Sequence, residues 1–299
     1  MTGTGKAVRL GRILPNGRAV FVPFDDALIN GPFGGLGDGL ARVREAAAGG
    51  ADGVMGFRGL LRRLSTRGIR VPFIANLTAS TVRSAHTRKH LVTSVEAAVA
   101  DGCDGVAAHV NVSARHEGQM LRTLGVIGEA CDRWGMPLLA IMYPRREDLD
   151  GDDNYLLLKS ADRRAYADLI AHAVRIGVEL GADIVKTQYS GDPESFSTVI
   201  AAACGVPVVI AGGELVPVGQ AIENARGAML AGAAGVCFGR NTYNRTDPAT
   251  FVSMLVSIVH HDDRTPSPLS AHTNASTSTT LAHGRSAPVQ QMSIGRGDR

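Results

Sequence analysis

Short apolar runs alternate with longer amphipathic segments along most of this 299-residue chain. The runs are apolar on both faces, which is typical of parallel strands covered by helices on each side. They occupy residues 19–24, 53–57, 71–77, 105–112, 137–143, 183–186, 207–213 and 235–239. We therefore predict eight buried strands.

The segments between these runs carry a helical pattern. Several of them, such as residues 91–102 and 117–135, are amphipathic and end in glycine, the residue preferred just after a helix. Eight strands that alternate with helices predict a (β/α)8 (TIM) barrel. An open doubly wound sheet is the less favoured alternative, because no G-x-G-x-x-G motif follows the first strand.

The composition changes near the carboxyl terminus. From about residue 262 onward, Ser, Thr, Gly, Pro and His replace the large apolar residues. Such a segment buries too little apolar surface to fold. We predict one barrel domain over residues 1–261 and a disordered tail over residues 262–299.

Composition and charge exclude several classes of function. The chain is 44% hydrophobic, but no apolar run approaches the roughly 20 residues that span a bilayer. The net charge of +3, with both signs interspersed, gives no indication of nucleic-acid binding and is compatible with small anionic substrates. The basic amino terminus lacks the apolar core of a secretory signal. The four cysteines are far apart in the sequence, so we expect reduced thiols and a cytoplasmic protein.

The ends of the predicted strands carry the chemistry. In a barrel of this kind the catalytic residues lie where the strands end, so these side chains should share one opening. The strand ends carry Asp25, Asp26, Arg58, His109, Asn111, Tyr143, Pro144, Arg145, Lys186, Gly212, Gly213, Gly239, Arg240 and Asn241.

Lys186 directly follows the apolar residues Ile184 and Val185. Most strand-end lysines extend their ammonium to water, whereas a buried one is costly unless it is paired or neutral. Among the other strand-end groups, Lys186 suits Schiff-base catalysis on a ketone, with its pKa lowered from about 10.4 by burial and by Arg58 or Arg145.

Two further groups complete this chemistry. The Tyr143 phenol can move protons to and from the carbinolamine, and the Asp25 carboxylate can act as a base. Gly212-Gly213 at the end of the seventh predicted strand and Gly239-Arg240 at the end of the eighth together indicate a phosphate site, which is common at that position of barrels. Gly212-Gly213 alone is also explained by a tight turn.

The motifs identify a resemblance from about residue 6 to residue 260. The chain resembles the archaeal-type class I fructose-bisphosphate aldolases and their relatives, the 2-amino-3,7-dideoxy-D-threo-hept-6-ulosonate synthases, and it looks most like the synthases. The motifs that carry the resemblance are VPFDD (22–26), ASTVRS (79–84), AHVNV (108–112), CDRWGMPLLAIMYPR (131–145), GADIVKT (181–187), GDPESF (191–196), VVIAGGE (208–214) and AGAAGVCFGRN (231–241).

The resemblance implies a role for each matching position. Lys186 would form the Schiff base, Tyr143 would donate the proton and Asp25 would be the acid–base partner. Phosphate would lie at Gly212, Gly213, Gly239 and Arg240, and Asp26, Pro144 and Arg145 would contact the substrate. The resemblance implies no cofactor and no metal, but it does imply a homo-oligomer.

The chain departs from the family beside the base. Asp26-Ala27 stands where the family usually has His-Gly, and Arg58 replaces the usual lysine after the second strand. These changes leave the lysine chemistry intact and put the aldehyde acceptor in question. They also keep open a different class of protein, a barrel that binds a phosphorylated ligand without catalysis.

Three activities compete within the resemblance. The first transfers a unit of a deoxyketohexose phosphate to L-aspartate semialdehyde, as in the heptulosonate synthases. The second joins dihydroxyacetone phosphate to the same aldehyde in the biosynthesis of an aminohydroxybenzoate, and the third cleaves fructose bisphosphate. We favour the first.

The remaining candidates are less favoured. A metal-dependent aldolase would need ligands such as His86, His90 and His109, but the first two are expected in a solvated basic loop. Lys89 and Lys159 are expected in polar loops that would not desolvate them. The acidic segment 146–163 is equally compatible with a lid and with a solvated loop.

Overall fold

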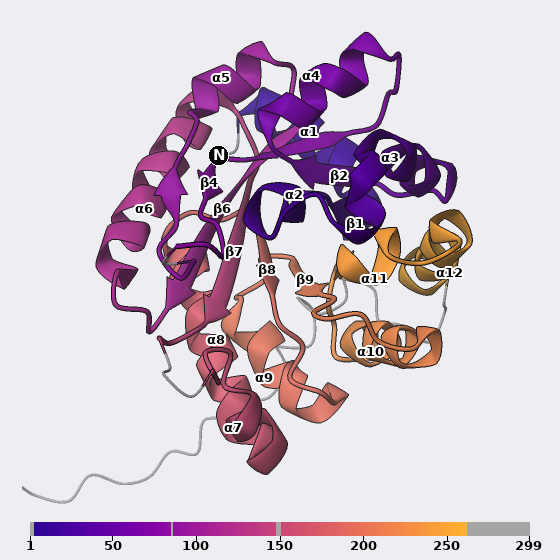
Figure 1. Ribbon diagram of the computed structural model, residues 1–299. Coiled ribbons are helices and arrows are strands. Elements are labelled where there is room, and N and C mark those ends of the chain that lie inside the picture. The colour runs from indigo at the N-terminus through magenta and orange to yellow at the C-terminus, as the bar shows by residue number, and fades with distance from the viewer. Residues whose placement is uncertain (1–2, 85, 148–150, 262–299) are drawn as a thin grey trace, which may run out of the picture.

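The strands of the computed structural model close into a barrel of eight parallel strands, and the structure describes residues 3–84, 86–147 and 151–261 (Figure 1). The barrel strands are β1 (Ala19–Pro23), β2 (Gly53–Gly56), β3 (Phe73–Asn76), β6 (Gly105–Val112), β7 (Leu138–Pro144), β8 (Ile184–Thr187), β9 (Val208–Ala211) and β10 (Gly235–Cys237). Their order around the ring is β1-β10-β9-β8-β7-β6-β3-β2. The predicted (β/α)8 barrel is confirmed, and the predicted tail lies outside the described residues.

Helices surround the ring of strands (Figure 1). The helices between and after the barrel strands are α3 (Gly39–Ala48), α4 (Arg58–Thr66), α5 (Val95–Ala100), α6 (Glu117–Trp134), α8 (Arg163–Glu179), α9 (Pro193–Ala202), α10 (Val218–Leu230) and α12 (Pro248–His260). Shorter helices are α2 (Asp26–Ile29), α7 (Leu156–Ala161), α11 (Arg240–Tyr243) and the 3-10 turns Pro15–Gly17 and Gly34–Asp38. Side-chain caps from Ser94, Asp162, Asp192 and Asp247 accept backbone N–H groups where four of these helices begin.

Two apolar cores lie on the two faces of the strands, because successive side chains point to opposite sides of the sheet. The outer core packs the strands against the helices. The inner core fills the barrel with Ala19, Phe21, Met55, Ile74, Ala107, Leu139, Ile141, Ile184, Val209 and Cys237. The parity of each strand therefore decides which of its residues reach the interior.

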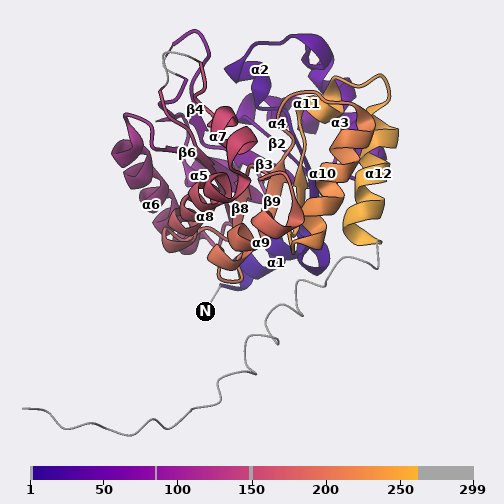
Figure 2. The ribbon, with the colours of Figure 1, turned by 90° about the horizontal axis from the view of Figure 1, so that it is seen from below.

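Helix α1 (Thr4–Ile13) closes the amino-terminal end of the barrel. Its residue Ile13 is 1% exposed and packs into the inner core. The buried Lys6 ammonium pairs with Asp132 at 2.7 Å and with Asp183 at 3.0 Å. Figure 2 shows α1 at one end of the barrel and α2 and α11 at the other. In the part of the chain that the structure describes, helix α1 covers one end of the barrel interior, and the other, carboxyl-terminal end is called the mouth below. Among the described residues, no helix is both long and apolar enough to cross a membrane.

A small hairpin beside the mouth is absent from the predicted elements. Strands β4 (Thr78–Ala79) and β5 (His90–Leu91) pair antiparallel. The Thr78 hydroxyl accepts the His109 backbone N–H at 2.8 Å, and the Asn111 amide donates to the Thr87 carbonyl at 2.7 Å. The segment between β4 and β5 is thereby fixed to the end of β6. Strands of two residues carry no hydrophobic period that a sequence could reveal.

Barrel closure between β1 and β10 depends on Gly235, which pairs with Ala19. Its φ is +151°, and a Cβ atom there would lie 1.9 Å from the Ala19 carbonyl oxygen. We expect Gly235→Ala to lower the free energy of unfolding by about 3 kcal/mol or more, because backbone has to move to relieve the overlap. Denaturant unfolding measures this loss. The control is Gly219→Ala in α10, where a Cβ meets nothing within 4 Å. Equal stabilities of the two variants would contradict the prediction.

Candidate active site

Because alternate residues of each strand point into the barrel, the position of a residue along its strand decides whether its side chain lies in the interior near the mouth. Lys186 is two residues beyond the inner-core residue Ile184, and Tyr143 is two beyond Ile141. The same step from Ala107 and Ile74 reaches His109 and Asn76, and Asp25 follows the end of β1. The structure thus brings together the predicted amine, phenol and carboxylate, and adds an imidazole and an amide.

Lys186 is 7% exposed and lies in the barrel interior. Burial acts to lower the pKa of its ammonium, but the Cys237 thiol, the Tyr143 phenol and the Asp25 carboxylate outweigh burial, so the pKa is raised. The expected lowering of this pKa is wrong. Free Lys186 is an ammonium and has to release a proton before it can attack a carbonyl.

Neither cation expected to lower the Lys186 pKa is among the groups that act on it. Arg58 pairs with Asp101 at the end of α5. Arg145 donates to the Asn154 side chain at 3.0 and 2.8 Å and lies 3.6 Å from the Asp153 carboxylate. Both guanidinium groups are therefore neutralised or held by other partners.

Asp25 is the acid–base candidate beside the lysine. Burial raises the pKa of its carboxyl, and the Lys186 ammonium together with a 2.8 Å hydrogen bond from the Asn76 amide opposes this shift. A carboxylate of raised pKa beside an ammonium can accept that ammonium's proton. Asn76 was not among the sequence candidates, although its parity with Ile74 in the run 71–77 indicates an interior position.

Tyr143 stands beside Lys186 as a protonated phenol. Burial raises the pKa of the phenol, which keeps its proton available for donation. The His109 ring packs edge-on against it, with 4.9 Å between centroids. Burial, together with the nearby Lys89 and Arg145 cations, lowers the pKa of His109 well below its usual value, so the ring is neutral. Its Nε2 atom is buried and has no hydrogen-bond partner among the described residues.

The predicted phosphate site is a compact turn cluster at the ends of β9 and β10. A Cβ on Gly212 would lie 3.0 Å from the Phe238 ring, and one on Gly239 would lie 3.0 Å from the Pro23 side chain, whereas Gly213 has φ +67° and open space. Asn241 organises the cluster by donating to the carbonyls of Gly212 at 2.9 Å and Glu214 at 2.6 Å.

Arg240 and Asp26 share one polar cluster at this side of the mouth. Arg240 pairs with Glu214 and lies 3.8 Å from the Asp26 carboxylate. Asp26 also accepts from the Tyr243 hydroxyl at 2.8 Å and from the Asn30 amide at 2.5 Å. Glu214 occupies the guanidinium that the sequence assigns to phosphate.

The remaining predicted contacts lie at the edge of the site. Pro144 is buried and pairs with Val112, an outer-core residue, so strand parity turns its side chain away from the interior. Arg145 lies at the rim, where its backbone N–H donates to the Val112 carbonyl at 2.8 Å.

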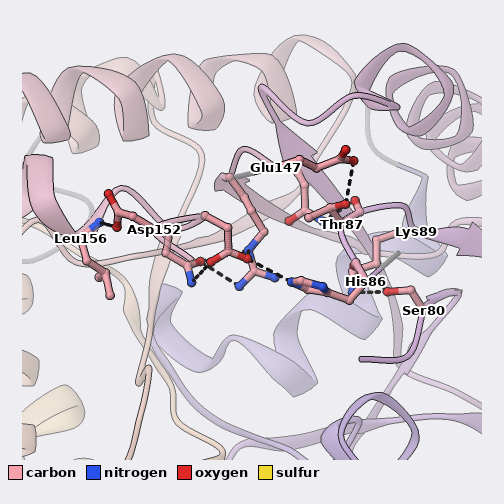
Figure 3. A network of polar contacts seen from close by, with 11 residues as sticks. Ser80, His86, Thr87, Lys89, Glu147, Asp152 and Leu156 are labelled. Carbon is pink, nitrogen blue, oxygen red and sulfur yellow. Dashed lines mark hydrogen bonds and ion pairs between the residues drawn. The ribbon is translucent and has the colours of Figure 1, made fainter. Parts of the chain in front are cut away.

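One expectation about the segment between β4 and β5 is wrong. Lys89 is 6% exposed rather than solvated, and its ammonium donates to the Ser80 hydroxyl at 2.7 Å. Burial and the nearby Arg145 lower its pKa to about 8. His86 and His90 are solvent-accessible, as expected, and His86 also pairs with Asp153 at 3.0 Å (Figure 3).

The expectation that Lys159 lies in a polar loop that would not desolvate it is also wrong. Lys159 lies on α7 and donates to the Tyr189 carbonyl at 2.8 Å, and burial lowers its pKa. The described part of the acidic segment is tied to the β4–β5 segment by the Asp153 contact and by a 3.0 Å hydrogen bond from Thr87 to Glu147 (Figure 3). Among the described residues, no three His, Cys, Asp or Glu side chains converge as metal ligands.

A buried lysine between a carboxylate and a phenol, at the mouth of an eight-stranded barrel, defines a site of the class I aldolase type. Residues 19–245 match the DeoC/LacD family of aldolases, and the chain belongs to this family.

Named relatives agree with this assignment. The chain is 36% identical over 263 residues to the 2-amino-3,7-dideoxy-D-threo-hept-6-ulosonate synthase of Halobacterium salinarum, covering 88% of this chain and 94% of the relative. It is 36% identical to the 2-amino-4,5-dihydroxy-6-oxo-7-(phosphonooxy)heptanoate synthase of Streptomyces griseus, covering 82% and 85%. An archaeal fructose-1,6-bisphosphate aldolase, solved with its catalytic Lys bound as a carbinolamine, superposes with a TM-score of 0.74 at 27% identity, covering 85% and 99%.

The Asn76 hydrogen bond predicts the acid limb of the pH–activity profile. Asn76→Asp keeps the shape of the side chain but removes the donor and adds a like charge beside Asp25. The pKa of Asp25 should rise further, so the carboxylate is lost at higher pH and the acid limb moves up by about one pH unit or more. The pH dependence of kcat/KM measures this shift. Asn30→Asp is the control, because Asn30 donates to Asp26; an equal shift in both variants would contradict a specific role of Asn76.

Proposed function

We propose that this chain is a Schiff-base aldolase or transaldolase that joins a phosphorylated ketose donor to L-aspartate semialdehyde. The observation that carries the proposal is the placement of Lys186 inside the barrel between Asp25 and Tyr143. The three groups match the nucleophile, base and proton donor that Schiff-base chemistry needs.

The charges of the site give the order of proton movements. Asp25 accepts a proton from the Lys186 ammonium, and the neutral amine attacks the donor ketone to form a carbinolamine. Tyr143 donates a proton to the departing hydroxyl, water leaves, and an iminium forms. The Tyr143 phenolate then takes a proton, either from the carbon next to the iminium or from the hydroxyl whose C–C bond breaks to release an aldehyde, and an enamine forms. The enamine attacks the acceptor aldehyde, and Tyr143 returns the proton to the new alkoxide. Water then hydrolyses the product iminium and restores the amine.

The turn cluster of β9 and β10 suits the donor phosphate. Backbone N–H groups at Gly212, Gly213 and Gly239 can approach an anion closely, and Arg240 adds a charged donor. The side chain of its present partner Glu214 is 81% exposed and can be displaced into water. A phosphate would then take the place of the Glu214 carboxylate on the guanidinium.

The acceptor follows from the chemistry of the relatives' products. Both named products are seven-carbon acids with an amino group at C2 and a ketone at C6. Cleaving such a compound as an aldol between C4 and C5 leaves a four-carbon amino-acid aldehyde, which is aspartate semialdehyde. Because sequence identity is 36% to both synthases, dihydroxyacetone phosphate is the second candidate donor beside a deoxyketohexose phosphate.

Two alternatives remain as outcomes of the test. Fructose-bisphosphate cleavage uses the same lysine and is favoured by the structural similarity to the archaeal aldolase. A barrel that binds a phosphorylated ligand without catalysis would keep the glycine turns and dispense with the amine. A homo-oligomer in the cytoplasm stays a prediction.

Sodium borohydride trapping tests the nucleophile. With dihydroxyacetone phosphate or a ketohexose phosphate, we expect a mass increase that peptide mapping assigns to Lys186, because borohydride reduces the iminium to a stable amine. The adduct should be absent in Lys186→Met and present in the control Lys159→Met. The donor that is trapped better ranks the competing activities. A folded protein that gives no adduct with any ketose phosphate would overturn the aldolase proposal, and an adduct on Lys89 would reassign the nucleophile.

Tyr143→Phe tests the proton donor. The substitution removes only the hydroxyl and keeps the ring that packs on His109. We expect kcat to fall by about 10²- to 10⁴-fold, the usual contribution of a positioned acid, while slow borohydride trapping at Lys186 persists. Steady-state kinetics measure the loss. The control Tyr155→Phe changes a half-buried phenol near Arg146 on the loop before α7 and should leave kcat within a few-fold; a similar loss in both variants would exclude a specific role for Tyr143.

A further inference from the structure

The order of strands places a second cationic group across the barrel from the phosphate turns. The ring runs β10-β9-β8-β7-β6-β3, so β6 and β3 lie opposite β9 and β10. The segment from Ser80 to Lys89 follows β3 and β4 and is fixed to the end of β6 through Thr87. In the proposed function, the donor phosphate lies at β9 and β10 and the donor ketone lies at Lys186. The reacting carbon of the donor then faces this segment.

Lys89 has an ammonium that makes no ion pair at contact distance with the described residues. It is 6% exposed, its hydrogen-bond partner is the neutral Ser80 hydroxyl at 2.7 Å, and no described carboxylate lies within ion-pair distance. Ser80 in turn donates to the His86 carbonyl at 2.7 Å, so the ammonium is held in place. An ammonium has three donors, and a buried charge is costly until an opposite charge meets it.

The neighbours of Lys89 point the same way. Arg145, Asp25 and Asp26 lie within electrostatic reach of its ammonium, and Lys89 itself acts on His109. The ammonium is thus buried and within electrostatic range of Asp25 and His109. The unpaired Nε2 of neutral His109 can donate or accept one hydrogen bond to a polar ligand there.

The segment that carries Lys89 is held from a second side. His86 pairs with Asp153 at 3.0 Å, and Thr87 donates to Glu147 at 3.0 Å. Figure 3 shows these contacts between the β4–β5 segment and the loop after β7, with Lys89 and Ser80 in the same network. Because both sides are anchored, the ammonium is presented at a fixed position, which favours selective binding.

We propose that Lys89 binds the anionic end of the acceptor aldehyde and thereby selects acceptors that carry a carboxylate or a phosphate. The proposal rests on the proposed function, which fixes where the donor lies. An anion on Lys89 receives charge-assisted hydrogen bonds and provides the missing countercharge. The acceptor's aldehyde carbon then points back toward the enamine on Lys186.

The test is Lys89→Met, which keeps the apolar stem and removes the charge. Two acceptors distinguish the source of the anion, L-aspartate semialdehyde for the carboxylate and glyceraldehyde 3-phosphate for the phosphate. For whichever acceptor the wild type uses, we expect KM to rise by about 10- to 100-fold with kcat within a few-fold, the usual effect of losing a charged hydrogen bond. Exchange of the donor's α-proton with deuterated solvent, which needs no acceptor, should stay unchanged.

Controls separate this inference from the proposed function. Lys159→Met removes another largely buried lysine and should leave KM for the acceptor unchanged. Two results would overturn the role of Lys89 although the wild type remains an active aldolase. One is an acceptor KM that is unchanged in Lys89→Met. The other is a loss of donor exchange in this variant that is as large as its loss of activity with the acceptor. Failure of the proposed function shows instead in the wild type, as absent donor exchange and trapping. If Lys89→Met does not fold, Ser80→Ala frees the ammonium from its anchor, and an acceptor KM that does not rise in this variant would overturn the proposal.

Discussion

The burial of one positive charge governs the architecture of this site. The Lys186 ammonium lies inside the barrel, where an unpaired charge would be prohibitively costly, so the interior has to supply compensating groups. Asp25 supplies the negative charge, and Cys237 and Tyr143 supply polarisable or hydrogen-bonding neighbours. These neighbours raise the pKa of Lys186, and burial, opposed by the Lys186 ammonium, raises the pKa of Asp25. In the proposed mechanism, transfer of a proton from Lys186 to Asp25 is therefore the first step.

Strand parity explains how so much of the site could be predicted from sequence. The eight apolar runs gave the strands to within one or two residues at most ends, and parallel strands place their carboxyl-terminal residues at one opening. Lys186, Tyr143 and Asp25 were chosen as strand-end residues and by the family resemblance, and strand parity accounts for their interior positions. Asn76 and Cys237 follow from the same parity, since each lies two residues beyond an interior position or within the interior core itself. Counting alternate residues within each run would have identified both.

The sequence does not reveal which groups contact each charged side chain. Arg58 and Arg145 read as cations near the lysine, but Asp101 and Asn154 hold them, and no local pattern records such contacts. Lys89 read as solvated because its neighbours in sequence are polar. Lys89 directly precedes β5 in a hairpin whose two strands have two residues each and which is fixed to β6, a tertiary contact that leaves no hydrophobic period in the sequence.

The two proposed anion sites of the mouth differ in their present partners, and this difference bears on the specificity that the proposals imply. Arg240 already has a carboxylate partner in Glu214, so binding a phosphate there is an exchange of one anion for another. Lys89 has only a hydroxyl partner, so an anion there gains a countercharge without displacing one. Discrimination between acceptors should therefore be sharper at Lys89, because an uncharged acceptor leaves a buried ammonium unpaired, whereas a donor lacking phosphate leaves Arg240 with Glu214.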